Sequence, residues 1–377
     1  MTAYPTARII ARRIGDHLKR HAAASHTEYG EPAATLPGPE VIEAIVEAGF
    51  WASLRREEGR TPKLSLAFVS AEQVDRPLVF ERPVRLAPEP LNRVAPAVER
   101  PGIHLGVWPS EGELRVWGAT RALPRNCFVL EIIAPGSLIL KQSPAEESGK
   151  FVNIAVLQGD EIKVVDQMTA RIPDCPELLI SLLGFESQHH AVEPVSVLIQ
   201  LAVSMRAHGR GGTLLVVPEN SEAWRESIVH PIVYSVTPAF SVLTDLMSAD
   251  SESRAERWWQ DALRRAVDVV AGLTAVDGAT VMTDRHELLA FGAKIARRPA
   301  HSQVTRVIVT EPIEGSTGET LEPTELGGAR HLSAAQFGHD QRDSIALVAS
   351  QDGRFTVFAW SPCDEMVHAH RIETLLL

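Results

Sequence analysis

The sequence is short of cysteine and has none of the long apolar runs that cross a membrane. Its 377 residues include three cysteines, Cys127, Cys175 and Cys363, which are far apart and form no CxxC pair. This pattern indicates neither a disulfide framework nor a structural zinc site, and it fits a reducing compartment. The longest apolar runs, such as 137–140 and 213–218, have the length of strands. The N-terminus shows no apolar leader segment, so we expect a cytoplasmic protein with no membrane span.

The sequence also lacks an excess of positive charge. Its formal net charge is −11, which argues against strong binding to a nucleic-acid backbone, because that affinity comes from Lys and Arg neutralising phosphates. With 45% apolar and 23% charged residues, the composition is that of a soluble globular protein. The length predicts two or three domains.

The first 60 residues read as a helical segment. Ile10, Ile14 and Leu18 follow one another at intervals of four, so they line one face of a helix. A helix packed on the following domain is the favoured interpretation, and a basic helix on a membrane surface is the alternative. A second helix is expected at 38–56, with Pro39 near its start.

Residues 61–168 read as a β-rich domain, because short β-like runs are separated by turn residues. We expect a small barrel or sandwich, with Trp108 and Trp117 either in its packing or as a stacking platform for a ligand. Residues 169–191 read as a connector, and its adjacent His189 and His190 are expected to be solvated rather than metal ligands.

Residues 192–377 alternate between helices and apolar strands. A helix with Val197, Leu201 and Met205 on one face ends at glycines, and a strand follows at 213–218. This alternation predicts an α/β fold, with a mixed sheet that carries helices on both faces. The other expected elements are a helical block at 242–273, strands within 277–284, 287–295 and 304–312, a helix from about Arg330, and a final two-stranded hairpin around Asp352-Gly353.

The stretch LGGARHLSAAQF at 326–337 is the first candidate for chemistry. Gly327 and Gly328 allow a ligand to approach the backbone closely, and the following helix offers unpaired N–H groups at its start. Arg330 is suited to grip phosphate or carboxylate oxygens, Ser333 adds a hydroxyl, and His331 is suited to a metal or a phosphate. The alternative is a Gly-rich loop whose arginine pairs with an internal carboxylate.

Two further segments carry weaker signals. Asp277, followed by Gly278 and Ala279, is sterically open, so its carboxylate is suited to Mg²⁺ or Mn²⁺ or to a ribose hydroxyl. An isolated Asp-Gly is more often a simple turn. Ser350 and Gln351 stand at the end of an expected strand, where ligand-binding groups often lie in open sheets.

The order of these segments on one α/β frame resembles the diadenylate cyclase domain, the nucleotide-binding module of the DNA-integrity scanning protein and its relatives. The resemblance covers about 192–377. It implies that the aspartate of an Asp-Gly-Ala motif binds a catalytic metal and the ribose 3′-hydroxyl, and that a Gly-Thr-Arg-His-Arg segment grips the triphosphate. In such domains two ATP molecules meet across a dimer and close into cyclic di-AMP.

The sequence departs from the motifs of that family at several positions. Residues 275–276 are Ala-Val where many cyclases have Leu-His, the loop threonine is Ala329, and the second arginine of the loop is Leu332. Loss of that arginine removes a phosphate cation, so triphosphate binding and turnover should be weakened. The whole chain is most similar to the divergent DACNV group, whose members are described as probable sensor domains.

The resemblance therefore implies a nucleotide-binding sensor that takes ATP or a cyclic dinucleotide, with weak or no turnover. The first alternative is an active, metal-dependent diadenylate cyclase with Asp277 as its catalytic residue, working as a homodimer. The second is a structural or interaction protein that has kept the fold and lost the ligand. The site implied comprises Asp277, Gly278, Ala279, Gly327, Gly328, Ala329, Arg330, His331, Ser333, Ser350 and Gln351, with Asp277 and His331 as ligands of Mg²⁺ or Mn²⁺.

Overall fold

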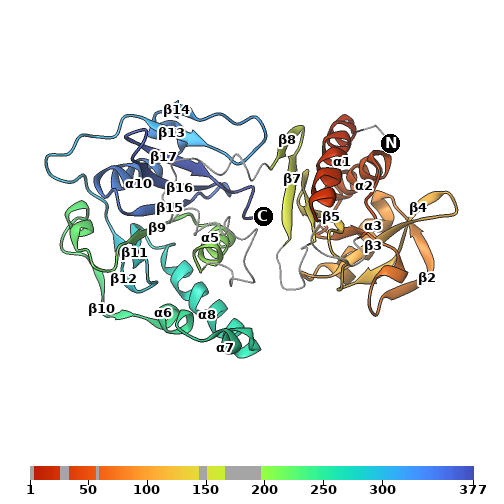
Figure 1. Cartoon of the computed structure of the whole chain (residues 1–377), viewed down its shortest axis with the longest axis horizontal. Helices are drawn as coiled ribbons and strands as arrows, with labels where there is room; N and C mark the ends of the chain where they lie inside the picture. Colours follow the sequence, from red (N-terminus) through yellow and green to blue (C-terminus); the bar gives the residue numbers. More distant parts are fainter. Residues whose placement is uncertain (1–3, 26–33, 57–58, 144–150, 166–196) are drawn as a thin grey trace. The chain divides into compact units, whose positions relative to one another are not determined.

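The protein divides into two compact units, residues 1–165 and 166–377. The structure is a computed structural model that describes residues 4–25, 34–56, 59–143, 151–165 and 197–377 (Figure 1). Each unit has its own sheet and its own hydrophobic core. The expected connector at 169–191, with His189 and His190, lies outside the described residues.

The first unit is built on one open eight-stranded sheet in the order β2-β4-β3-β1-β5-β6-β7-β8. β1 and β3 are parallel and the other neighbouring pairs are antiparallel. The prediction of a barrel or sandwich was therefore wrong. Its elements are α1 (Pro5–Ser25), α2 (Pro39–Ser53), β1 (Ser65–Phe68), β2 (Leu78–Arg85), α3 (Pro88–Val98), β3 (His104–Ser110), β4 (Glu113–Thr120), β5 (Phe128–Ala134), β6 (Ser137–Gln142), β7 (Val152–Gln158) and β8 (Glu161–Val164), with a short 3₁₀ turn at Ala71–Gln73.

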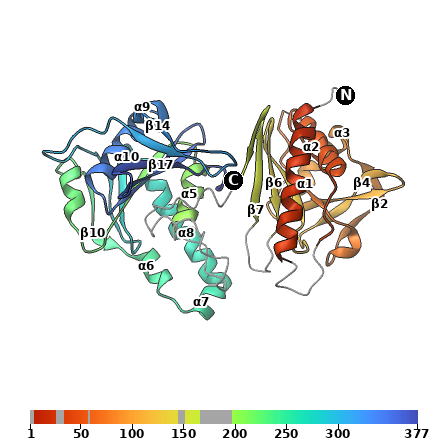
Figure 2. The ribbon, with the colours of Figure 1, turned by 45° about the horizontal axis from the view of Figure 1, so that its top comes forward.

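Helices α1, α2 and α3 cover one face of this sheet (Figure 2). Ile10, Ile14 and Leu18 of α1 are all buried, in one core cluster with residues of α2, α3 and the strands. This confirms that α1 is a packing helix. These helices cover the face of the sheet that a second sheet would cover in a sandwich.

The two tryptophans of the β-rich region take part in packing. Trp117 is buried and its indole N–H donates to the carbonyl of Val69 at 2.7 Å. A Cβ placed on Gly106 would lie 2.1 Å from this indole, so only glycine fits there. Trp108 is half-buried and packs against Phe68.

The second unit contains a nine-stranded mixed sheet in the order β10-β12-β11-β9-β15-β16-β17-β13-β14. The α/β fold class is confirmed. β10, β14 and β17 were not predicted, and the helical block is split into three helices. The elements are α5 (Val197–Ala207), β9 (Gly212–Val217), a 3₁₀ turn at Ala223–Ser227, β10 (Tyr234–Phe240), α6 (Val242–Met247), α7 (Ser251–Ala255), α8 (Arg257–Leu273), β11 (Ala279–Thr283), β12 (Leu288–Ala293), β13 (Val307–Thr310), β14 (Glu319–Leu321), α9 (Pro323–Leu326), α10 (Ala329–Asp340), β15 (Ile345–Ala349), β16 (Phe355–Ser361) and β17 (Met366–Arg371).

Helices cover both faces of this sheet, as the alternating side chains of β9 show. Leu214 and Val216 belong to the core shared with α5 and α8, whereas Leu215 and Val217 belong to the core shared with α10. Because neighbouring residues of a strand point to opposite faces, a strand apolar throughout must be buried on both sides. In Figure 1 α10 and α5 accordingly flank the central strands.

Candidate functional site

Three of the predicted segments meet at one edge of the second sheet. β9 and β11 are parallel and begin at this edge, with Ala279 opposite Thr213. β15 is antiparallel to β9 and ends there, with Ala349 opposite Gly212. Helix α10 begins at Ala329. Its start lies at the same edge, since Nη1 of Arg330 would be only 2.7 Å from a Cβ placed on Gly211. We call this region, comprising Gly211, Asp277, Lys294, Gly327–His331 and Ser350, the glycine-loop site.

Asp277 stands at the entrance to β11 and is paired with Lys294, which belongs to none of the sequence motifs. Its Oδ2 accepts a hydrogen bond from Nζ of Lys294 at 2.5 Å. Lys294 follows β12, whose last residue, Ala293, pairs with Ala279 across the antiparallel strands. Lys294, and then Arg330, lower the pKa of the exposed Asp277 carboxyl. The carboxylate is therefore ionised and has a cation in contact with it.

Arg330 lies over the backbone of Gly211, in the turn that leads into β9. Gly211 has φ +71°, and a side chain there would meet the guanidinium group. Within the described residues Arg330 forms no ion pair, although its charge reaches Asp277. The half-buried guanidinium thus keeps its donors for another acceptor, unlike the arginine of a closed internal ion pair.

His331 is buried and its ring packs directly against the glycine loop. Its side chain is 3% exposed, and its Nε2 lies 3.5 Å from the hydroxyl oxygen of Ser350. A Cβ placed on Gly327 would lie 2.4 Å from its Nδ1. Burial lowers the pKa of His331, with Arg371, Arg354 and Arg330 acting in the same direction and Asp352 opposing them. The imidazole is therefore neutral at pH 7 and acts here as a packing and hydrogen-bonding group.

The other predicted residues lie around this centre. Gly278 has φ +115° and approaches the backbone of Gly292 so closely that a Cβ would lie 2.5 Å from its carbonyl carbon. Gln351 is exposed and its amide donates to the carbonyl of Arg210 at 3.3 Å. Ala279 is buried in the sheet, and Ser333 is half-buried one turn into α10.

Asp277 and His331 do not form a ready metal cage. The carboxylate of Asp277 is already paired with the ammonium group of Lys294. Mg²⁺ prefers an octahedral shell of oxygens, so this carboxylate would supply one ligand only after Lys294 moved away. The donor set therefore suits an anionic ligand better than a resident metal.

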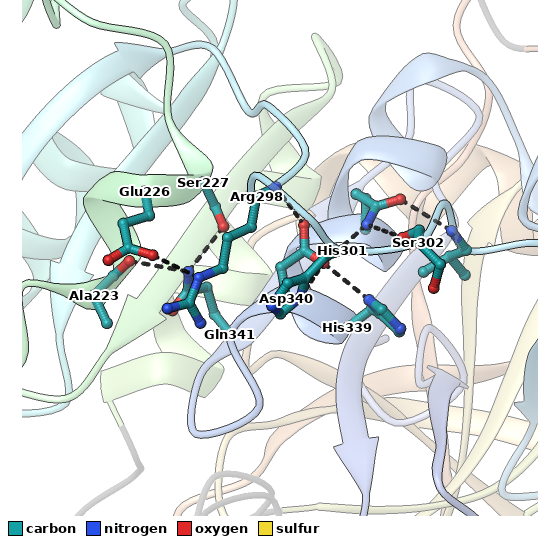
Figure 3. Close-up of polar contacts among 11 residues, drawn as sticks. Ala223, Glu226, Ser227, Arg298, His301, Ser302, His339, Asp340 and Gln341 are labelled. Atoms are coloured by element: carbon teal, nitrogen blue, oxygen red, sulfur yellow. Dashed lines mark hydrogen bonds and ion pairs between the residues drawn. The ribbon is translucent and has the colours of Figure 1, made fainter.

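A second group of polar residues lies at the opposite edge of the sheet, beyond the end of β9. A cavity of about 280 Å³ is lined there by residues that include Pro218, Ser221, Trp224 and Arg298. His301 and Asp340 also line it, and His339 lies beside Asp340 (Figure 3). Sequence reasoning missed these residues, because no spacing motif joins a histidine in the β12–β13 loop to the end of α10.

Comparisons with known proteins place a family match in the first unit. The family model described as "Probable sensor domain DACNV" matches residues 31–121, about a quarter of the chain. The matched segment begins before α2, contains α2 and α3, and ends one residue after β4. No curated protein matches the chain. The chain is thus similar to a sensor domain family over this segment, which does not include the glycine-loop site.

Within the part of the chain that the structure describes, no helix has the length and apolarity needed to pass through a lipid bilayer.

Proposed function

We propose that the protein is a sensor whose second unit binds a nucleotide, ATP or a cyclic dinucleotide, at the glycine-loop site. The observation that carries the proposal is the arginine at the start of α10. Arg330 lies over Gly211 with no ion pair among the described residues, beside a loop whose Gly328 precedes the first helical turn. A guanidinium group and free helix N–H groups together favour phosphate oxygens.

Lys294 supplies a second cation to this site. Its ammonium group lies within hydrogen-bonding distance of Asp277, so the site presents positive charge on two sides of the carboxylate. A phosphate bound beside Arg330 would also be attracted to Lys294, while the second carboxylate oxygen of Asp277, Oδ1, would accept a hydrogen bond from a ribose hydroxyl. The proposal therefore requires no metal for binding.

The same pairing disfavours turnover. A cyclase of the kind that the sequence resembles needs a metal at the Asp277 carboxylate, and here the Lys294 ammonium group competes for that position. Leu332, which stands where the resemblance expects a second arginine, removes a charge that would steady departing pyrophosphate. Both features favour a receptor over an enzyme.

The first unit is proposed to transmit or read out occupancy of the glycine-loop site. The DACNV match, described as a probable sensor domain, lies wholly within it, so we assign a signalling role to this unit. A separate ligand-binding unit and a separate unit of the sensor type suit a protein that reports ligand occupancy to a partner.

Calorimetric titration of the full chain with ATP and with cyclic di-AMP, each in EDTA and in Mg²⁺ or Mn²⁺, tests the proposal. We expect binding by at least one ligand in EDTA, and a loss of affinity of about tenfold or more in Arg330→Gln. Arg264→Gln is the matched control, because Arg264 lies on an exposed face of α8. If neither nucleotide binds in any of these buffers, the proposal is wrong.

The retained Asp277 and Arg330 make an active diadenylate cyclase the second candidate. Incubation with ATP and Mn²⁺, followed by chromatography for cyclic di-AMP, distinguishes the two. A receptor gives bound ATP and no cyclic product across metal and protein concentrations. Product that disappears in Asp277→Asn would establish the cyclase instead.

A further inference from the structure

The described residues bring two histidines and an aspartate together at the edge of the second sheet opposite the glycine-loop site. His301 comes from the loop between β12 and β13, and His339 and Asp340 are the last residues of α10. Nδ1 of His301 lies 3.1 Å from Oδ1 of Asp340, and Nδ1 of His339 lies 2.9 Å from the same oxygen (Figure 3). We call these three residues the His–Asp cluster.

Hydrogen bonds from neighbouring groups fix the position of the Asp340 carboxylate at the centre of the cluster. The Asp340 side chain is fully buried, and its Oδ2 accepts the backbone N–H of Arg298 at 2.8 Å. Its Oδ1 also accepts the amide of Gln336 at 3.0 Å. Gln336 is itself held by the backbone of Ser302 and Val304. An ionised carboxylate has thus been placed deep in the protein with its oxygen turned toward two imidazoles.

The two histidines remain accessible from outside. Their side chains are 32% and 21% exposed, and their rings lie at 90° with centroids 6.0 Å apart. His301 and Asp340 line the cavity of about 280 Å³ at this edge. A small cation could therefore reach the cluster without unfolding α10, and its remaining coordination positions would face the cavity.

The geometry points to a site for a divalent transition-metal ion. Its ligands would be Nδ1 of His301, Nδ1 of His339 and a carboxylate oxygen of Asp340. Zn²⁺ is the probe best suited to this ligand set. The ligand atoms all lie within 4.8 Å of one another. In a tetrahedral zinc site with bonds of about 2.0–2.2 Å, neighbouring ligands are about 3.4 Å apart. The cluster therefore needs only small side-chain shifts to close around an ion.

The chemistry of the ligand set supports this class of ion. Two imidazole nitrogens and one carboxylate suit Zn²⁺ and its neighbours among the first-row metals, whereas Mg²⁺ and Ca²⁺ prefer oxygen. The Nδ1 atoms that face Asp340 are the ligand atoms, so on binding each neutral ring moves its single proton from Nδ1 to Nε2 through solvent, and the ion takes the place of that proton at Nδ1 with no net proton release. Three protein ligands and an open position are the pattern of reactive rather than purely structural zinc sites.

Zinc titration of the EDTA-treated full chain, without nucleotide, tests the assignment by calorimetry and by the absorption spectrum of the Co²⁺ form. We expect about one Zn²⁺ per chain and a loss of affinity of at least about 100-fold in both His301→Gln and His339→Gln. Both histidines are partly exposed, so these variants should fold, and circular dichroism checks this. His230→Gln, an exposed histidine outside the cluster, is the control and should bind as the wild type does.

Two outcomes would overturn the site. One is that Zn²⁺ does not bind, which would mean that the cluster is a hydrogen-bonded group holding α10 to the β12–β13 loop. The other is that Zn²⁺ binds equally well to the wild type and to the two cluster variants, which would place the ion elsewhere. Neither outcome bears on nucleotide binding, because Arg330 and Lys294 are not among the ligands.

Discussion

His331 illustrates how the surroundings of one residue limit its chemistry. As an isolated imidazole at the start of a helix it would be a candidate metal or phosphate ligand. In the fold its ring is buried, faces Ser350 and lies against Gly327. Its contribution to the glycine-loop site is therefore to hold the loop in place, and Arg330 beside it carries the charge.

The two glycines of the loop give a matched pair of substitutions. Gly327→Ala would push a methyl group into the His331 ring, whereas a Cβ on Gly328 meets nothing within 4 Å. We expect Gly327→Ala to cost about 1–3 kcal/mol of stability through overpacking and to weaken nucleotide binding by about tenfold. Gly328→Ala should leave the stability nearly unchanged. Thermal unfolding measures the stability of both variants and calorimetry the binding by Gly327→Ala, and an equal loss of stability in the two would refute the packing argument.

His104 of the first unit sets a pH dependence of stability. Burial lowers its pKa to about 4, and its Nδ1 lies 2.7 Å from the hydroxyl oxygen of Ser65. Between pH 6.5 and about 4 the unfolded chain binds the proton and the folded chain does not, so the free energy of unfolding falls as the pH falls. The expected loss across this window is about 3 kcal/mol.

An NMR titration of the histidine rings checks this directly. The resonance that disappears in His104→Gln should titrate near pH 4, and the same variant should lose less stability than the wild type on acidification to pH 4.5. A His104 ring that titrates near 6.5 would show that it is not desolvated.

At the scale of elements, α10 connects the two candidate sites. Arg330 and His331 lie in its first turn, and His339 and Asp340 are its last two residues. Its 12 residues span about 18 Å, from one edge of the sheet to the other. The packing of Ala334 and Phe337 in the sheet core fixes both ends relative to the strands.

Helix α1 offers a test of its packing role with two adjacent isoleucines. Ile10 is fully buried and Ile9 is 54% exposed. Ile10→Ala should therefore reduce the free energy of unfolding by about 2–5 kcal/mol, and Ile9→Ala by about 0.5 kcal/mol or less. Urea denaturation measures both. Similar small effects for the two would mean that α1 does not belong to the core.

The sequence patterns predicted elements best where one physical signal dominated. β9 was recognisable because it contains the continuous apolar run Leu-Leu-Val-Val at 214–217, and the β15–β16 hairpin because Asp352-Gly353 marks its turn, where Gly353 has φ +88°. Helix α3 was missed because prolines interrupt its pattern, and β10 because it is an edge strand with mostly exposed side chains.

Some residues of the two candidate sites could likewise be predicted from local motifs, and others could not. Asp277 and Arg330 stand in local motifs and could be named in advance. Lys294 could not, because its contact with Asp277 depends on the register of β11 against β12. The contact between His301 and Asp340 depends on how a loop folds over the end of a helix. Such contacts arise from tertiary structure, and single-sequence patterns do not encode them.

At the scale of the whole molecule, the chain has two units with separate cores, and we propose a different function for each. The unit that matches the DACNV family has a sheet covered by α1, α2 and α3, and the other unit carries both candidate sites. The second of these units is the one that we propose binds a nucleotide, at the glycine-loop site.

The most direct test is a crystal structure of the full chain grown with ATP or cyclic di-AMP at a concentration that saturates the calorimetric signal. We expect phosphate density within hydrogen-bonding distance of Arg330 and Lys294, over the start of α10. Phosphate density elsewhere in the molecule, for example in the cavity beside Asp340, would contradict it.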